Sequence, residues 1–297
     1  MSDRIFGCIE AGGTKFLVGI VGAPDDIRET ARFDTTTPEE TIAATIAWLK
    51  AAQLRHGMLS AIGIASFGPI ELDRTAPNWG HITATTKNGW SDTDFAARIG
   101  RELGLPVGFD TDVNGAALAE SRWGVGRGKP VCIYVTIGTG IGGGAIVDGK
   151  PLQGLSHPEM GHIRVPRHVA DRDFAGACPF HGDCLEGLAS GPAIMARWGV
   201  SLSELPDEHP AHDIIAWYLA QMIVTLQSIM EPACIILGGG VTGTPGLIER
   251  IRSKATDLGG GYFRGQAREI IVSPDLGDKA GLLGALALAQ DIIRSEP

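Results

Sequence analysis

The chain has 297 residues, a formal net charge of -9 at pH 7, 44% hydrophobic residues and 42 glycines. The negative charge argues against nucleic acid as a global partner, because contact with a phosphate backbone requires a basic face. The N-terminal residues lack the basic and apolar regions of a secretory signal, and no apolar run approaches the roughly 20 residues that span a bilayer. We therefore expect a cytoplasmic protein, long enough for two domains.

Strand and helix patterns alternate along the chain. Near the N-terminus, the apolar residues 5–9 and 16–21 predict two strands joined by a glycine turn. Residues 131–150 repeat this strand–turn–strand pattern about 125 residues later, which indicates two related halves. The predicted helices are 38–57, 92–104, one that begins near Asn114, 213–230, 246–260 and 280–293, and the other strands begin near 59, 106, 233 and 269. This alternation is typical of the α/β class with mixed sheets.

Two segments match the dinucleotide-binding pattern G-x-G-x-x-G, one starting at Gly138 and the other at Gly238. The first is followed by a strand pattern, whereas the motif requires a helix. The second does lead to a helix, but the acid of the following strand, Asp275, lies 32 residues past Gly243, where the motif requires about 20. Both matches therefore argue against a Rossmann dehydrogenase.

A second interpretation of the glycine turns is a pair of phosphate-binding sites. Consecutive backbone N–H groups in a turn form an anion-binding nest, and threonine hydroxyls add donors. One nest would consist of Gly12, Gly13 and Thr14, with Lys15 adding positive charge, and the other of Gly138, Thr139 and Gly140. The alternative is that both segments are only tight hairpin turns.

The segment "GFDTDVNG" places Asp110 and Asp112 at the end of a predicted strand, just before a helix. Reactive side chains in open α/β sheets lie at this end of the strands. A carboxylate there can accept a proton from an attacking hydroxyl. Equally, Asp112 can be a helix cap that binds the first free N–H groups.

His162, Cys178, His181 and Cys184 have the spacing H-x15-C-x2-H-x2-C. Two thiolates and two imidazoles fit a closed tetrahedral zinc site. Such a site would be structural, because no coordination position remains open. The alternative is a loop of unliganded histidines and reduced cysteines. The remaining cysteines lie in apolar strand patterns and are expected in the core: Cys8, Cys132 and Cys234.

Glu159 and Glu186 flank the proposed metal ligands. Carboxylates accept hydrogen bonds from several hydroxyls. Two carboxylates held in place by a metal-bound loop therefore suit recognition of a polyol. Solvated surface acids are the alternative.

Together these motifs resemble the ROK family of sugar kinases, most closely its bacterial fructokinase branch. The resemblance covers nearly the whole chain and is carried by "IEAGGTKF", "DTDVNGAALAE", "VTIGTGIGGG", "HPEMGHI", "CPFHGDCLEGLASGPAI" and "IILGGGV". The C-x2-H-x2-C spacing resembles the fructokinase branch, since many other members carry C-x-C-x4-C. Thr111 and Glu10 stand where most members have Asn and Asp, which also resembles that branch.

The resemblance implies an actin/hexokinase-like (ribonuclease H-like) fold with two α/β domains and an active cleft between them. The N-terminal domain is expected to span residues 1–116 and to be joined by a C-terminal helix at about 283–297. The larger C-terminal domain, with the zinc-binding loop, is expected to span residues 117–282.

The resemblance also implies ATP-dependent, Mg²⁺-assisted phosphorylation of fructose at its 6-hydroxyl, with Asp112 as the general base and a structural Zn²⁺. The residues implied at the sugar are Thr111, Glu159, His162 and Glu186. Those implied at ATP are Glu10, Gly12, Gly13, Thr14, Lys15, Gly138, Thr139, Gly140, Gly239 and Gly240. A homodimer is the family expectation. A kinase for mannose, glucose or another hexose and a non-catalytic sugar sensor are the alternative functions.

Overall fold

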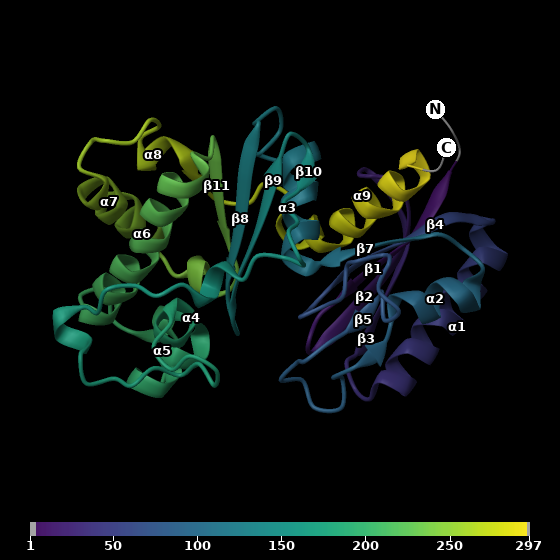
Figure 1. The fold of residues 1–297 in the computed structure, drawn as a ribbon, viewed down its shortest axis with the longest axis horizontal. Coiled ribbons are helices and arrows are strands. Elements are labelled where there is room, and N and C mark those ends of the chain that lie inside the picture. The colour runs from purple at the N-terminus through teal and green to yellow at the C-terminus, as the bar shows by residue number, and fades with distance from the viewer. Residues whose placement is uncertain (1–3, 296–297) are drawn as a thin grey trace. The chain divides into compact units, whose positions relative to one another are not determined.

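The computed structural model describes residues 4–295 and divides the chain into two compact units (Figure 1). The first unit runs from the N-terminus to Trp123 and also includes Gln153–His157 and the segment from Leu276 onward. The second unit consists of Gly124–Leu152 and Pro158–Asp275. Each unit is built around one mixed sheet.

The sheet of the first unit has the strand order β3-β2-β1-β4-β7. Neighbours in the β3-β2-β1 part pair antiparallel, and β4 pairs parallel with both β1 and β7. The strands are β1 (Ile5–Ala11), β2 (Lys15–Ala23), β3 (Asp26–Asp34), β4 (Leu59–Ser66) and β7 (Val107–Thr111). A separate two-stranded sheet pairs β5 (His81–Ile82) with β6 (Thr93–Asp94).

Helices cover both faces of this first sheet (Figure 1). One face packs its apolar side chains against α1 (Pro38–His56) and α2 (Ala96–Leu103). The other face lies against α9 (Ala280–Ser295), which in turn packs on α3 (Asp112–Trp123). At Gly63 on β4 an added Cβ would overlap the backbone of Ala285, so α9 comes close to the sheet only because this residue is glycine.

The close contact between α3 and α9 also requires glycine. A Cβ at Gly284 would overlap the backbone of Gly115. We predict that Gly284→Ala destabilises the protein by about 1–3 kcal/mol, because the two helices would have to move apart. The measurement is Tm by calorimetry. Gly243→Ala is the control, since a Cβ there meets nothing within 4 Å. An unchanged Tm for Gly284→Ala would contradict this account of the packing.

The second sheet has the order β10-β9-β8-β11-β12, which repeats the order and directions of the first. Its strands are β8 (Val131–Ile137), β9 (Ile141–Val147), β10 (Lys150–Pro151), β11 (Cys234–Gly238) and β12 (Ile271–Val272). The helices of this unit are α4 (Leu185–Ala189), α5 (Gly191–Trp198), α6 (Pro210–Met230), α7 (Leu247–Gly259) and α8 (Ala267–Ile270). The repeated strand order confirms the two related halves, and the α/β class with mixed sheets is correct.

α6 is long and apolar enough to cross a membrane by length and composition alone, so the expectation that no apolar segment approaches that length was wrong. Its residues Ile215, Leu219 and Ile223 are fully buried in the core of the second unit. The hydropathy of α6 is therefore explained by its place in that core. The predicted core cysteines Cys8, Cys132 and Cys234 are likewise buried.

Two local predictions were wrong. The helix expected from residue 92 begins at Ala96, because residues 93–94 pair with β5 instead. The strand expected from residue 269 begins at Ile271, after the short α8. The edge strand β3 was not predicted at all, since it is partly exposed along its length and its charged sequence lacks a clear apolar face.

Candidate active site

The carboxyl end of β7 leads directly into α3. Here the Thr111 hydroxyl accepts a hydrogen bond from the Asn114 N–H at 3.1 Å, the contact that an N-cap side chain makes. The half-buried Asp112 lies in the first turn, where its Oδ1 accepts from the Val113 N–H at 2.8 Å. Thr111 is therefore the N-cap residue of α3, and Asp112 also binds one of the first free N–H groups, as its capping alternative expected. That Asp112 acts as a general base stays a prediction.

Asp110, only 1% exposed, is the centre of a buried polar network beneath this turn. Its Oδ1 accepts from the Thr111 N–H and from the Asn114 Nδ2, both at 2.7 Å, and its Oδ2 accepts from the Gln153 Nε2 at 3.3 Å. Burial raises the pKa of the Asp110 carboxyl, and these donors oppose that shift. Asp110 thus acts as an anchor for the backbone on which Asp112 stands.

Sequence reasoning did not predict Asn114 and Gln153 as members of this network. Gln153 is 43 positions from Asp110, so no local pattern connects the two. Asn114 is fully enclosed, and its Oδ1 has no hydrogen-bond partner among the described residues. An asparagine four positions after the strand-end Asp110 was the available signal for at least this residue.

The first glycine turn joins β1 to β2. The Gly12 N–H donates to the Lys15 carbonyl at 2.9 Å, and the Thr35 hydroxyl donates to the Gly12 carbonyl at 2.7 Å. The Gly12 N–H is thus engaged within the turn. A phosphate-binding nest here would have to use the groups that follow, those of Gly13 and Thr14.

Glu10 lies near the end of β1, just before this turn. Burial raises the pKa of its carboxyl, whereas the nearby charges of Lys15 and Arg32 lower it. A Cβ at Gly281 on α9 would overlap the Glu10 carboxylate, so this glycine leaves the space that the side chain occupies. Gly281 is a second supporting residue that was not predicted from the sequence.

The second glycine turn joins β8 to β9 and contains Gly138, Thr139 and Gly140. The Gly138 N–H donates across the turn to the Gly140 carbonyl at 2.9 Å. The Gly138 carbonyl accepts from the Gly191 N–H at 2.8 Å, and the Ile141 N–H donates to the Glu186 Oε2 at 2.9 Å. The α4–α5 segment therefore supports this turn from one side.

Gly239 and Gly240 follow the end of β11. Gly239 has a φ of 91°, and a Cβ there would overlap the backbone of Ile137 on β8. Both the left-handed conformation and the close approach require glycine at this position. The chain can turn sharply here at the carboxyl end of the second sheet, next to the second glycine turn.

The four predicted metal ligands lie together in the second unit, all with ligand atoms within 4.8 Å of one another. The His162 Nδ1 lies 3.2 Å from the His181 Nδ1 and 3.4 Å from the Cys184 Sγ, and the Cys178 Sγ lies 3.7 Å from the His181 Nδ1. Nitrogen and sulfur atoms around one zinc ion stand roughly 3.3–3.8 Å apart at the corners of a tetrahedron. The donor set and its spacing thus fit Zn²⁺, and the predicted grouping of these residues is confirmed.

His162 connects this cluster to the two flanking carboxylates. Its Nδ1 faces the other ligands, whereas its Nε2 lies 4.0 Å from the Glu159 Oε2 and 4.0 Å from the Glu186 Oε1. These separations are longer than hydrogen bonds, but they place both carboxylates beside the outer nitrogen of the ring. The two glutamates therefore flank the metal cluster.

Each unit holds part of the predicted site. The first unit contains Glu10, Gly12, Gly13, Thr14, Lys15, Thr111 and Asp112, and the second contains Gly138, Thr139, Gly140, Glu159, His162, Cys178, His181, Cys184, Glu186, Gly239 and Gly240. That the two groups act on the same substrates stays a prediction.

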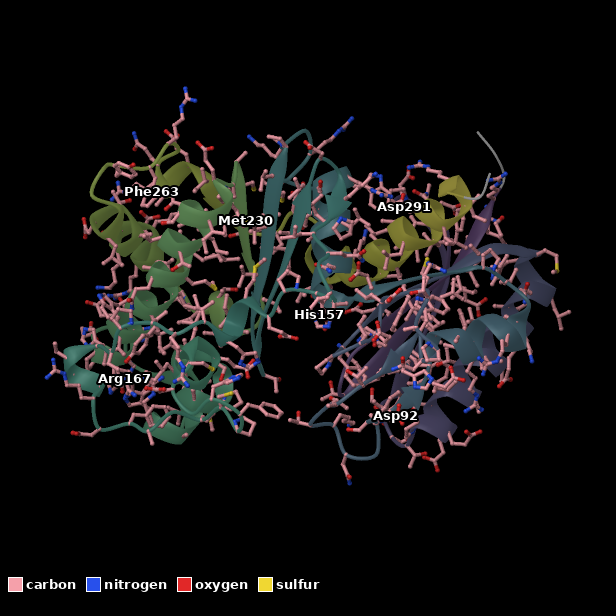
Figure 2. All side chains as sticks on the ribbon, viewed as in Figure 1. Asp92, His157, Arg167, Met230, Phe263 and Asp291 are labelled. Atoms are coloured by element: carbon pink, nitrogen blue, oxygen red, sulfur yellow. The ribbon has the colours of Figure 1, made fainter. Side chains whose placement is uncertain are left out.

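Two further histidines near these residues in the sequence, His157 and His168, have local contacts. His157, labelled in Figure 2, belongs to the first unit, where its Nε2 accepts from the Ile70 N–H at 3.4 Å. The His168 Nδ1 accepts from the Ala170 N–H at 3.2 Å and so caps a short 3-10 helix. Neither belongs to the metal cluster.

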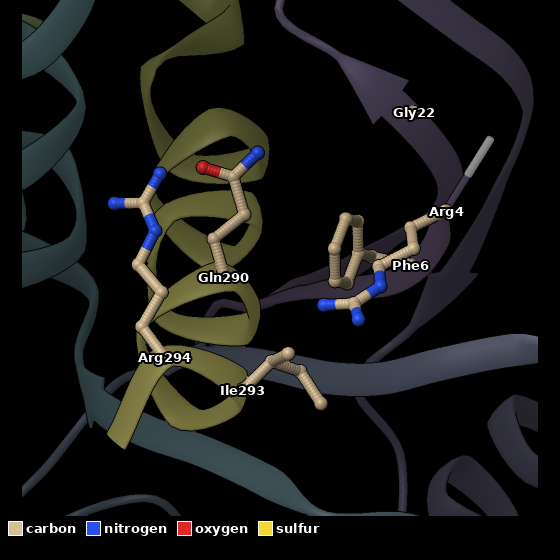
Figure 3. Close-up of a pocket in the computed structure, with 6 residues that line it drawn as sticks. All are labelled: Arg4, Phe6, Gly22, Gln290, Ile293 and Arg294. Atoms are coloured by element: carbon tan, nitrogen blue, oxygen red, sulfur yellow. The ribbon is translucent and has the colours of Figure 1, made fainter. Parts of the chain in front are cut away.

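A small cavity of about 160 Å³ lies between α9 and the start of β1 (Figure 3). It is lined by Arg4, Phe6, Gly22, Gln290, Ile293 and Arg294. These residues lie at the opposite end of β1 from Glu10, and none of them is among the predicted site residues. The cavity is therefore separate from the turns and carboxylates described above.

Known proteins resemble this chain over nearly its whole length. The family model described as the ROK family matches residues 6–292. The chain belongs to the ROK family. ROK relatives include a fructokinase of Zymomonas mobilis, 49% identical with 96% of each chain covered, and a fructokinase of Streptococcus mutans, 38% identical with 98% of this chain and 99% of the relative covered.

Solved ROK structures have the same fold. The ROK hexokinase of Thermus thermophilus matches with a TM-score of 0.81 and 24% identity over 98% of this chain and 99% of its own. A ROK glucokinase of Streptomyces griseus, solved in complex with glucose and AMPPNP, matches with a TM-score of 0.73 and 27% identity over 97% and 99%. The actin-like fold expected from the sequence is thereby confirmed.

Proposed function

We propose that this ROK protein is a fructokinase that transfers the γ-phosphoryl group of ATP to the 6-hydroxyl of D-fructose. The observation that carries the proposal is its 49% identity to the Zymomonas mobilis fructokinase over 96% of both chains. Similarity to a Streptomyces coelicolor glucokinase is lower, 29% over 95% of this chain. Fructose is therefore the favoured hexose, with mannose, glucose or another hexose as the alternative.

Asp112 is the general base in this proposal. Its carboxylate stands in the first turn of α3, held there by the Thr111 cap and the Asp110 network. It takes the proton of the 6-hydroxyl as the oxygen attacks the γ-phosphorus, and ADP leaves from the opposite side. Because the base is held by buried contacts, little reorganisation is needed when the sugar binds.

The sugar is recognised by Thr111, Glu159, His162 and Glu186. The two carboxylates accept hydrogen bonds from hydroxyl groups, and the Nε2 of His162 lies between them. Zn²⁺ would be held by His162, Cys178, His181 and Cys184, and when bound it supplies a rigid brace without an open coordination position. Burial raises the pKa of the Cys184 thiol to about 11. A bound metal cation would stabilise the thiolate form.

The nucleotide is held by the glycine turns in this proposal. The turns Gly12–Thr14 and Gly138–Gly140 hold the phosphates, Lys15 adds positive charge, and Gly239 and Gly240 border the adenosine. Mg²⁺ would be held with the phosphates near Glu10, and when bound it neutralises their charge. The enzyme is proposed to act in the cytoplasm as a homodimer, without a nucleic-acid or membrane partner.

A coupled assay of ADP release over fructose, mannose, glucose and other hexoses tests the proposal. With Mg-ATP present, we expect fructose to have the highest kcat/KM of the panel. Sugar-dependent ADP release that is highest for another hexose would assign the enzyme to that sugar. Binding of hexose without any ADP release would replace the kinase by a sugar sensor.

A further inference from the structure

Glu186 makes contacts in two directions within the second unit. Its Oε1 lies 4.0 Å from the Nε2 of the metal-cluster residue His162. Its Oε2 accepts a hydrogen bond from the Ile141 N–H at 2.9 Å, at the point where the chain leaves the second glycine turn and enters β9. One carboxylate thus lies near the metal-cluster histidine and is hydrogen-bonded to the backbone at the end of the second glycine turn.

The surroundings of Glu186 are adapted to this contact. Ile141 is 2% exposed, so its N–H has no access to bulk water as an alternative acceptor. A Cβ at Gly140 would lie 2.7 Å from the Glu186 Oε2, closer than such contacts allow, so glycine at this position keeps the space for the carboxylate. The turn and the side chain therefore fit each other closely.

A second contact joins the same two segments. The Gly191 N–H, at the start of α5, donates to the Gly138 carbonyl at 2.8 Å. The segment between Cys184 and Gly191 therefore connects the metal cluster at one end with the glycine turn at the other. Cys184, a metal ligand, immediately precedes α4, and Glu186 is the second residue of that helix.

We propose that Glu186 is a positioning residue for the phosphate turn Gly138–Gly140, in addition to its role at the sugar. The inference rests on the proposed function, because it assumes that this turn binds nucleotide phosphates. The acceptor on Glu186 holds the backbone of the turn in its binding conformation before any sugar arrives. Nucleotide affinity in the absence of sugar then depends on this side chain.

The test compares Glu186→Ala with Glu186→Gln by calorimetric titration with Mg-AMPPNP in the absence of sugar. Alanine removes the acceptor of a buried N–H, and we expect binding about tenfold weaker than for the wild type. Glutamine retains an oxygen that can accept from Ile141, and we expect affinity within about twofold of the wild type. A role confined to the sugar predicts no change in either variant.

Zinc content and Tm are measured on each variant, so that a collapsed metal loop is not mistaken for a lost contact. If Glu186→Ala does not fold, Gly140→Ala provides the second test, with Gly243→Ala, a glycine of the same unit that lies outside both glycine turns, as the control. A Cβ at Gly243 meets nothing within 4 Å, whereas one at Gly140 displaces the Glu186 carboxylate. We expect the loss of Mg-AMPPNP affinity to be several-fold greater for Gly140→Ala.

The results separate this inference from the proposed function. Wild-type affinity in a folded Glu186→Ala, equal weakening in the alanine and glutamine variants, or equal losses in the two glycine variants would each overturn the positioning role. A wild-type protein that does not bind Mg-AMPPNP at all would overturn the kinase proposal as well.

Discussion

Replacing Asp112 with asparagine is expected to lower kcat for fructose by about 10²–10⁴-fold, the contribution typical of a general base. The amide has nearly the shape of the carboxylate and can still accept from the Val113 N–H through its oxygen, so α3 should begin as before. It cannot take up the proton of the sugar hydroxyl. The measurement is steady-state ADP release with Mg-ATP and fructose, together with Mg-AMPPNP titration.

The affinity for Mg-AMPPNP should stay close to that of the wild type, since Asp112 is assigned to the sugar hydroxyl and not to the phosphates. Asp148→Asn serves as the control. This aspartate is exposed on the turn between β9 and β10 and has a positive φ of 49°, which asparagine tolerates. Near-normal turnover by Asp112→Asn would remove Asp112 from the role of base.

The second large effect is expected for Cys184→Ser. Loss of one thiolate from a four-ligand set should reduce zinc from about one ion per chain to near zero, as measured by elemental analysis of the purified protein. Since metal binding contributes to folding, Tm should fall by roughly 5–10 °C. KM for fructose should rise, because His162 and the two glutamates lose their brace.

Cys132→Ser is the matched control for this substitution. Cys132 is also a fully buried cysteine of the second unit, but it lies on β8 and outside the metal cluster. It is expected to lose some stability and to keep its zinc. If Cys184→Ser retained a full complement of zinc, the proposed ligand set would be wrong.

Much of the fold could be predicted because its signals are local. The two strand–glycine–strand segments are visible in the sequence, and the two sheets do share one strand order. The strand β3 was missed for the opposite reason. Its charged, partly exposed sequence lacks a hydrophobic pattern, and it is a strand because β2 supplies a pairing edge.

In the candidate site, too, the local sequence predicts some features and leaves others open. Cys178, His181 and Cys184 are separated by two residues each, so the local spacing by itself predicts a shared metal. The role of Asp112 was ambiguous from the sequence, because cap and base have the same pattern. The tertiary structure gives the N-cap contact to Thr111 and a second N–H contact to Asp112, so both side chains bind free N–H groups of α3.

By itself, the sequence of this protein determined the α/β class, the internal repeat, the grouping of two histidines with two cysteines, and the family. These follow from spacings of a few residues and from motifs read along the chain. Only the tertiary structure decided that Gln153 holds Asp110, 43 positions away, and that Glu186 holds Ile141, 45 positions away. Such contacts arise when the sheets and helices pack and close long loops, and no local pattern specifies which side chains then meet.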